Sequence, residues 1–215
     1  LEQTLEKLYF QNEIQKVIVV AIYSSAARVQ EYGTASCPDY AKRGSLAGKY
    51  ARFITEELIP FINLRYHTLT NSDNTAFAGF SLGGLSALDI AWAHSELFSK
   101  VGVFSGSLWW RKKALDNGYT DADRIMHSII RSSNVRKGMK FWFQTGTDDE
   151  TKDRNNNGII DSIDDTLDLI KELELKGYSI NRDIRYLEIL EGTHSKETWA
   201  EALPDFLKWT FGNKN

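Results

Sequence analysis

The chain of 215 residues is long enough for one domain built around a single core, and it contains no linker or internal repeat. With 42% hydrophobic residues, 26% charged residues and a net charge of −3, it has neither a basic stripe for nucleic acid nor an apolar run that could span a membrane. The single cysteine, Cys37, excludes a disulfide framework. We therefore expect one domain over residues 1–215, with no nucleic-acid or membrane partner.

Helices and strands are predicted to alternate along the chain. The run KVIVVAIY at residues 16–23 is rich in β-branched residues and predicts a strand buried on both faces. In chain order, the predicted elements are a helix over 1–12, a strand over 16–23, a helix over 46–63, a strand over 75–80, a helix over 82–94, a strand over 100–104, a helix over 123–131, a strand over 140–144, a helix over 165–176, a strand over 183–190 and a helix over 196–211. This alternation is typical of an α/β fold, with a mostly parallel sheet and helices on both faces.

The sequence GFSLG at residues 79–83 matches the G-x-S-x-G nucleophile elbow, in which a serine lies on a sharp turn between a strand and a helix. A predicted strand precedes Ser81, a predicted helix follows it, and Gly84 adds a third glycine. The glycines are expected because side chains on either side would collide with the turn. We predict Ser81 as a nucleophile and the N–H of Leu82 as an oxyanion donor. The alternative is a glycine-rich turn with an incidental serine.

A serine nucleophile needs a base that takes its proton. His194 follows a predicted strand and precedes the last helix, where the base belongs in the chain order nucleophile, acid, base. His67 precedes the serine, His94 ends the helix after it, and His127 lies in an irregular segment, so these three fit less well. We predict His194 as the base.

The acid that orients the imidazole is expected after the strand over 140–144. The sequence there offers three adjacent carboxylates, Asp148, Asp149 and Glu150. We favour Asp149 and keep Glu150 as the alternative. Carboxylates in such a loop that do not bind the imidazole are expected to be solvated.

Residues 153–164 (DRNNNGIIDSID) match the spacing of an EF-hand calcium loop, with Gly158 at the sharp turn. Oxygen ligands are predicted from Asp153, Asn155, Asn157, the Ile159 carbonyl, Asp161 and Asp164. The last position is Asp164 rather than the usual glutamate, which brings the loop closer to dockerin loops. Because the loop follows Asp149 closely, we expect a structural Ca²⁺ that braces the acid and takes no part in the chemistry. The alternative is an Asn-rich surface loop that caps the next helix.

Five segments in combination resemble one family. They are FITEELIPFI (53–62), NTAFAGFSLGGLSAL (74–88), VGVFSGSLWW (101–110), GTDDE (146–150) and EGTHSKETWAEALPDFLKW (191–209). Together they resemble the esterase family that includes esterase D (S-formylglutathione hydrolase), enterochelin esterases, and the feruloyl and acetylxylan esterases of carbohydrate esterase family 1, with the mycolyltransferases as more distant members. The resemblance runs from Val17 to the C-terminus. It implies an α/β-hydrolase fold and ester hydrolysis without a catalytic cofactor.

Carried over by position, the resemblance implies Ser81 as nucleophile and His194 as base. The acid is Asp149 by the esterase D pattern or Glu150 by the mycolyltransferase pattern. Members of the family also carry an earlier strand followed by an Asp-Gly loop that supplies the second oxyanion N–H. The strand predicted over 16–23 resembles the strand after that one, so we expect this chain to lack the first strands and half of the oxyanion hole.

The predicted function is hydrolysis of a feruloyl or acetyl ester of a plant polysaccharide, or of a similar small-molecule ester. The second candidate is a siderophore ester of the enterochelin type. A third, from another class, is a non-catalytic binding protein on the same fold, in which calcium and the tryptophans Trp109, Trp110 and Trp199 organise a ligand surface.

Overall fold

Four parallel strands form the centre of the structure, a computed structural model that describes residues 1–213. The strands are β1 (Ala76–Phe80), β2 (Lys100–Phe104), β3 (Lys140–Asp148) and β4 (Ile184–Thr193). They lie in chain order, and each pairs in parallel with the next. The predicted α/β class and parallel sheet are confirmed.

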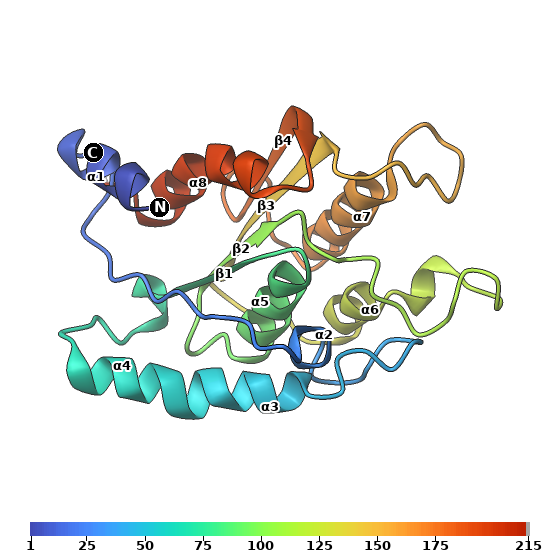
Figure 1. The fold of residues 1–215 in the computed structure, drawn as a ribbon, viewed down its shortest axis with the longest axis horizontal. Coiled ribbons are helices and arrows are strands. Elements are labelled where there is room, and N and C mark those ends of the chain that lie inside the picture. Colours follow the sequence, from blue (N-terminus) through green and yellow to red (C-terminus); the bar gives the residue numbers. More distant parts are fainter. Residues whose placement is uncertain (214–215) are drawn as a thin grey trace.

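Helices cover both faces of this sheet. They are α1 (Glu2–Phe10), α2 (Arg28–Glu31), α3 (Ala47–Arg52), α4 (Ile59–Arg65), α5 (Leu82–Ala93), α6 (Ile125–Ser132), α7 (Asp161–Leu175) and α8 (Lys196–Phe211). A π-helical turn, Phe53–Leu58, joins α3 to α4, and short 3₁₀ turns lie at Ser72–Asn74 and Asp121–Asp123. Figure 1 shows α5, α6 and α7 on one side of the sheet and α1 with α8 on the other.

Each face of the sheet has its own core, because successive side chains of a strand point to opposite faces. On β3, Phe141 and Phe143 pack in the larger core with α5 and α7, whereas Trp142 packs with Phe206 of α8 in the smaller one. All three β3 side chains are fully buried. Burial on both faces explains why KFWFQ reads as a continuous apolar run.

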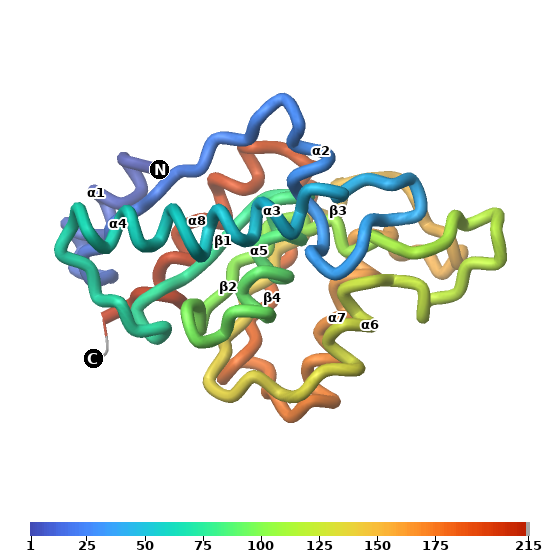
Figure 2. Tube along the Cα trace, turned by 90° about the horizontal axis from the view of Figure 1, so that it is seen from below, coloured from blue at the N-terminus to red at the C-terminus, as the bar shows by residue number. Residues whose placement is uncertain are grey.

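The strand predicted over residues 16–23 is wrong. The segment forms no strand, and Ile18, Val19 and Val20 are 52%, 46% and 39% exposed. Among residues 1–213 the sheet ends at β1, so the run has no neighbouring strand to pair with. β-Branched composition favours a strand only where such a partner exists. Figures 1 and 2 show the segment crossing from α1 to α2 as an extended connection.

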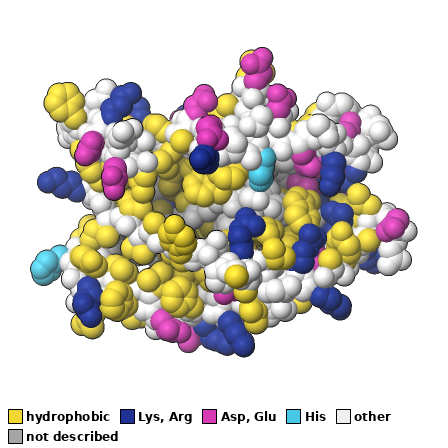
Figure 3. Space-filling view, in the orientation of Figure 1, with side chains coloured by type: hydrophobic (Ala, Val, Ile, Leu, Met, Phe, Trp, Pro, Cys, Tyr) yellow, Lys and Arg dark blue, Asp and Glu magenta, His cyan; other side chains and the backbone are white. Residues whose placement is uncertain are grey.

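An apolar surface lies next to this connection. Figure 3 shows hydrophobic side chains gathered between the α1–α8 pair and the α3–α4 pair. Part of it is a groove lined by Val20, Ile22, Tyr50, Phe53 and Leu58. No helix within the described part of the chain is long and apolar enough to cross a bilayer.

Candidate active site

Ser81 occupies a strained turn between β1 and α5. Its φ of 57° lies in a region that residues other than glycine rarely adopt. A Cβ on Gly79 would come within 2.2 Å of the Gly83 carbonyl oxygen, so this glycine is required for the turn. A Cβ on Gly83 would meet nothing closer than the Tyr32 ring at 3.7 Å. The expectation that both flanking glycines avoid collisions therefore holds for Gly79 only.

The hydroxyl of Ser81 faces the end of the neighbouring strand. Its Oγ lies 3.5 Å from the Oγ of Ser107, and the Ser107 N–H donates to the Ser81 carbonyl at 3.1 Å. The N–H of Leu82, at the start of α5, has no acceptor among the described residues. A free N–H at a helix N-terminus next to a serine hydroxyl suits a developing negative charge.

His194 directly follows β4, with its side chain 41% exposed. Its Nδ1 lies 3.9 Å from Oδ1 of Asp149, and its ring forms a T-shaped pair with that of Trp199, with 5.2 Å between ring centroids. Within residues 1–213 it makes no hydrogen bond to Ser81. Hydrogen bonds of this kind are often long or unformed in enzymes without substrate and tighten when substrate binds.

Asp149 is the carboxylate that faces His194. Its side chain is 1% exposed, and it accepts hydrogen bonds from the Gly146 N–H at 3.0 Å and the Ser105 hydroxyl at 3.1 Å. Burial raises the pKa of Asp149, although these two donors and His194 act in the opposite direction. The carboxylate is thus held by donors that favour its charged form.

Glu150 is directed elsewhere. Burial and the neighbouring carboxylates of Asp161 and Asp165 raise the pKa of Glu150, while Lys152 acts in the opposite direction. Those carboxylates belong to the first turns of α7. Of the two candidate acids, the structure brings only Asp149 to His194.

The other three histidines do not reach Ser81. His94 ends α5 and lies 3.3 Å from Glu96. His127 is buried on α6, where its Nε2 lies 2.8 Å from the Asp165 carbonyl and burial lowers its pKa to about 3. His67 is exposed in the connection before β1.

Two serines and a tryptophan complete the neighbourhood. Ser105 and Ser107 follow β2, at the edge of the sheet where the strands' carboxyl ends meet. The indole of Trp199 stacks on Phe80, with 5.0 Å between ring centroids, and donates to the Ser105 hydroxyl at 2.9 Å. From the sequence, Trp199 was expected either to stack on a ligand or to pack in the core or at its rim, and no role was predicted for the two serines, although the SGS run after a predicted strand was a usable signal.

The two adjacent tryptophans have different environments. Trp110 is fully buried, and Cβ atoms on Gly33 and Gly44 would come within 2.7 and 2.8 Å of its ring, so it packs in the core and is not free to stack on a ligand. Trp109 is partly exposed, and the guanidinium of Arg43 lies 4.8 Å from its ring centroid.

The loop predicted to bind calcium is folded around its own oxygens. The side-chain amides of Asn155 and Asn157 both donate to the Asp164 carboxylate at 3.0 Å, and the Gly158 N–H donates to Asp153 at 2.8 Å. Asp161 is instead engaged by Arg154, through its backbone N–H at 2.9 Å and its guanidinium at 3.1 Å.

Counting only His, Cys, Asp and Glu, no cluster of three converges as a metal site in the described residues. The side chains that do meet in this loop therefore include the asparagines. Ile159 is 39% exposed, and its N–H donates to the Asn157 side chain at 2.8 Å. Among the predicted ligands, the structure thus brings the side chains of Asn155, Asn157 and Asp164 together and pairs Asp161 with Arg154 instead.

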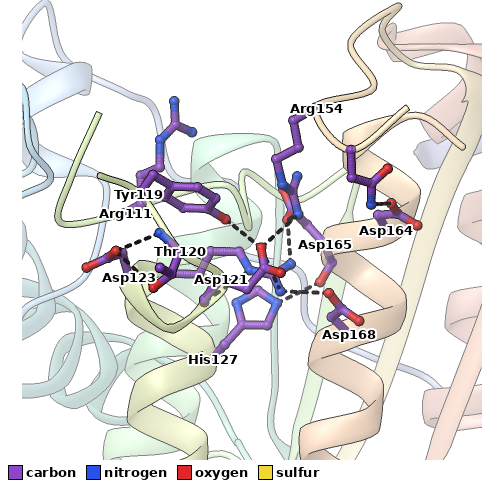
Figure 4. Close-up of polar contacts among 12 residues, drawn as sticks. Arg111, Tyr119, Thr120, Asp121, Asp123, His127, Arg154, Asp164, Asp165 and Asp168 are labelled. Carbon is purple, nitrogen blue, oxygen red and sulfur yellow. Dashed lines mark hydrogen bonds and ion pairs between the residues drawn. The ribbon is translucent and has the colours of Figure 1, made fainter. Parts of the chain in front are cut away.

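A buried charge network lies beneath this loop (Figure 4). Arg124, 4% exposed at its side chain, donates to Asp165 and to Asp168 at 2.6 Å each. Arg154 of the loop donates to the same Asp165 at 2.7 Å. The network ties the segment between β2 and β3 to α7 and to the loop. Local sequence patterns carry no signal for it, because Arg124 precedes β3 and lies 41 positions from Asp165 and 44 from Asp168.

Known proteins resemble this chain along most of its length. The sequence model of the family described as "Putative esterase" matches residues 1–210. The uncharacterised protein YbbA of Bacillus subtilis is 23% identical over 215 residues, which cover 98% of this chain and 79% of that protein.

Solved structures share the fold. A ferulic acid esterase superposes with a TM-score of 0.67 at 17% identity, covering 97% of this chain and 76% of the other. The enterochelin esterase of Shigella flexneri superposes with a TM-score of 0.67 at 19% identity, covering 96% of this chain and 45% of the other. The chain therefore spans less than half the length of the Shigella protein. The fold is that of the α/β-hydrolases.

Proposed function

We propose that this chain, which belongs to the "Putative esterase" family and is a carboxylic ester hydrolase, forms an acyl-enzyme on Ser81 during the reaction. His194 takes the proton of Ser81 Oγ while Oγ bonds to the ester carbonyl carbon. His194 then gives that proton to the leaving alcohol as the ester C–O bond breaks. Water, deprotonated by the same imidazole, attacks the acyl group and releases the acid and free Ser81.

Asp149 is the proposed acid of this triad. Its carboxylate would hold the Nδ1–H of His194, so that Nε2 is the nitrogen that faces Ser81 and the imidazolium is stabilised when it forms. The Leu82 N–H is the proposed oxyanion donor, and removing one such donor costs about 10²- to 10³-fold in rate in a well-studied protease. The single observation that carries the proposal is the buried Asp149 carboxylate facing His194, both at the carboxyl edge of the sheet that carries the strained Ser81.

For the substrate, we propose an ester with an aromatic acid, with a feruloyl ester as first candidate. Phe80 precedes the nucleophile, is 43% exposed and stacks on Trp199, so an apolar aromatic surface adjoins Ser81. Such a surface favours a planar aromatic acyl group over acetate through stacking and apolar burial. Solved relatives by fold include a ferulic acid esterase and an enterochelin esterase, which supports the feruloyl ester and keeps the siderophore ester as second candidate.

The test measures hydrolysis of methyl ferulate, methyl acetate and p-nitrophenyl acetate by the wild-type protein beside Ser81→Ala. Activity that disappears in the variant supports the serine mechanism, and kcat/KM higher for ferulate than for its non-aromatic counterpart methyl acetate supports the aromatic substrate. A trilactone of catechol-acylated serine tests the siderophore candidate in the same assay. A protein that hydrolyses none of these and does not react with a fluorophosphonate probe would be a binding protein instead, because only an activated serine is labelled.

We also propose that residues 153–164 bind a structural Ca²⁺. Asp153, Asn155, Asn157, Asp164 and the Ile159 carbonyl would hold the ion, since hard oxygens in this spacing suit it. In support, three of these side chains already converge: the Asn155 and Asn157 amides lie on the Asp164 carboxylate. The pairing of Asp161 with Arg154 argues against direct ligation by Asp161. The ion would fix the loop and the segment that precedes it, and would take no part in ester chemistry.

Thermal unfolding with Ca²⁺, with Mg²⁺ and with EDTA tests the calcium proposal. A ligand that binds only the folded state stabilises it by about 2.7 kcal/mol at one hundred times its Kd. We expect Ca²⁺ to raise the Tm of the wild type and not that of Asp164→Asn, whereas Asp73→Asn, a change at an exposed aspartate before the start of β1, keeps the response. Equal Tm and equal activity with and without Ca²⁺ would rule out the proposed role.

A further inference from the structure

Ser105 is a buried residue in an unfavourable backbone conformation at the end of β2. It is 2% exposed, and its φ of 44° lies in the left-handed region that serine rarely occupies. Its hydroxyl lies between two partners: it accepts from Trp199 Nε1 at 2.9 Å and donates to Asp149 Oδ1 at 3.1 Å. Retained backbone strain of this kind clusters at functional sites, so the strain calls for an account of what the hydroxyl does.

The chemistry of these two bonds is directional. A serine hydroxyl has one proton and a tryptophan indole can only donate, so the Trp199 bond leaves the Ser105 proton free for the carboxylate of Asp149. The oxygen that receives it, Oδ1, is also the one that lies 3.9 Å from His194 Nδ1. The other carboxylate oxygen accepts from the Gly146 N–H at 3.0 Å. Both oxygens are therefore fixed, and the carboxylate cannot rotate away from the imidazole without losing a hydrogen bond.

We infer that Ser105, oriented by the indole N–H of Trp199, is a positioning residue that holds Asp149 in line with His194; this rests on the proposed triad. The Trp199 ring also lies roughly perpendicular to the His194 ring, so one indole contacts the imidazole and orients the hydroxyl that fixes the proposed acid. The role of Ser105 is exerted in the transition state, when His194 becomes charged, and not in substrate binding. Its loss should therefore lower kcat and leave KM nearly unchanged.

The experiment uses Ser105→Gly, Trp199→Phe and the double variant, assayed on methyl ferulate with the wild type and Ser81→Ala alongside. Glycine removes the hydroxyl and suits the φ of 44°, and phenylalanine keeps an aromatic ring while removing the N–H. Two control variants lose hydrogen bonds of the same kind to groups outside the proposed triad. Ser99→Ala removes a buried hydroxyl at the opposite end of β2 that donates to the Ser72 carbonyl. Trp142→Phe removes an indole N–H that donates to Asp205.

We expect kcat to fall about 10- to 100-fold in Ser105→Gly, the usual range for a hydrogen bond to a charged group, with KM within about 2-fold of the wild type. Trp199→Phe should show a smaller fall, and the double variant should match Ser105→Gly, because the indole N–H acts through the hydroxyl. Both controls should keep the wild-type kcat. A Ser105→Gly variant with wild-type kcat, or two effects that simply multiply in the double variant, would overturn the inference. A wild type no more active than Ser81→Ala would instead refute the proposed function.

Discussion

The identity of the acid can be decided by one pair of variants, Asp149→Asn and Glu150→Gln. The two residues are adjacent, but only Asp149 faces His194, with 3.9 Å between its Oδ1 and the imidazole Nδ1. Asparagine keeps the shape and cannot stabilise the imidazolium, and the same change in a serine protease triad lowers kcat about 10⁴-fold. Since His194 is 41% exposed and water can partly replace the carboxylate, we expect a fall of about 10³-fold, or about 4 kcal/mol.

The assay is kcat for methyl ferulate, with the rate of fluorophosphonate labelling of Ser81 as a second measurement that does not depend on the acyl group. Glu150→Gln should stay within about 3-fold of the wild type, because Glu150 lies by the start of α7. The Tm of each variant is measured as well, since Asp149 also accepts from Gly146 and its loss affects folding. A larger fall in Glu150→Gln than in Asp149→Asn would refute the assignment.

Three further changes test the scaffold around the site. Gly79→Ala should abolish activity and lower the Tm, because its Cβ would lie 2.2 Å from the Gly83 carbonyl oxygen, whereas Gly83→Ala should keep the Tm. Arg124→Met should lower the free energy of unfolding in urea by about 3 kcal/mol, because Asp165, 1% exposed, loses one of its two guanidinium partners; a loss under about 1 kcal/mol would contradict this. Burial raises the pKa of Asp89 to about 6. Between about pH 4 and about pH 6, the Asp89 carboxyl of the folded protein therefore holds a proton that the unfolded chain has released. The contribution of Asp89 to the free energy of unfolding should therefore fall by about 3 kcal/mol as the pH rises from about 4 to about 6, which is measured as the difference in pH dependence between the wild type and Asp89→Asn.

The parts of the fold that local sequence determines were predictable. The nucleophile elbow is contiguous, so strand, glycines, serine and helix could be recognised together over residues 76–93. The last helix was predicted over 196–211 and has those bounds, because its N-terminal Ser195 accepts from the Thr198 N–H as a helix cap. The strand over 16–23 failed for the opposite reason: a strand needs a neighbour, and pairing is not a local property.

The difference between local sequence and contacts between distant segments also explains why the role of Ser105 was not predicted. Ser105 contacts Asp149 across 44 positions of sequence and Trp199 across 94, so its two bonds depend on how β2, β3 and α8 are packed. Composition and periodicity carry no information on such contacts. The sequence could not distinguish Glu150 from Asp149 as the candidate acid for a similar reason. The side chains of adjacent residues point in different directions, and these directions depend on how the chain leaves β3.

An irregularity in the pairing of β3 and β4 lies just before His194. Pairing is regular up to Gly146 opposite Ile189, but Asp148 then pairs with Thr193, so β4 has two extra residues there. The bulge includes Glu191, whose φ is 58° and whose N–H donates to the Thr147 hydroxyl at 2.7 Å. Bulges next to active sites re-aim side chains, and this one displaces the end of β4 relative to β3 just before His194. In a parallel sheet whose order follows the chain, Ser81, Asp149 and His194 come from the ends of β1, β3 and β4, and the bulge lies where β4 brings His194 towards Asp149.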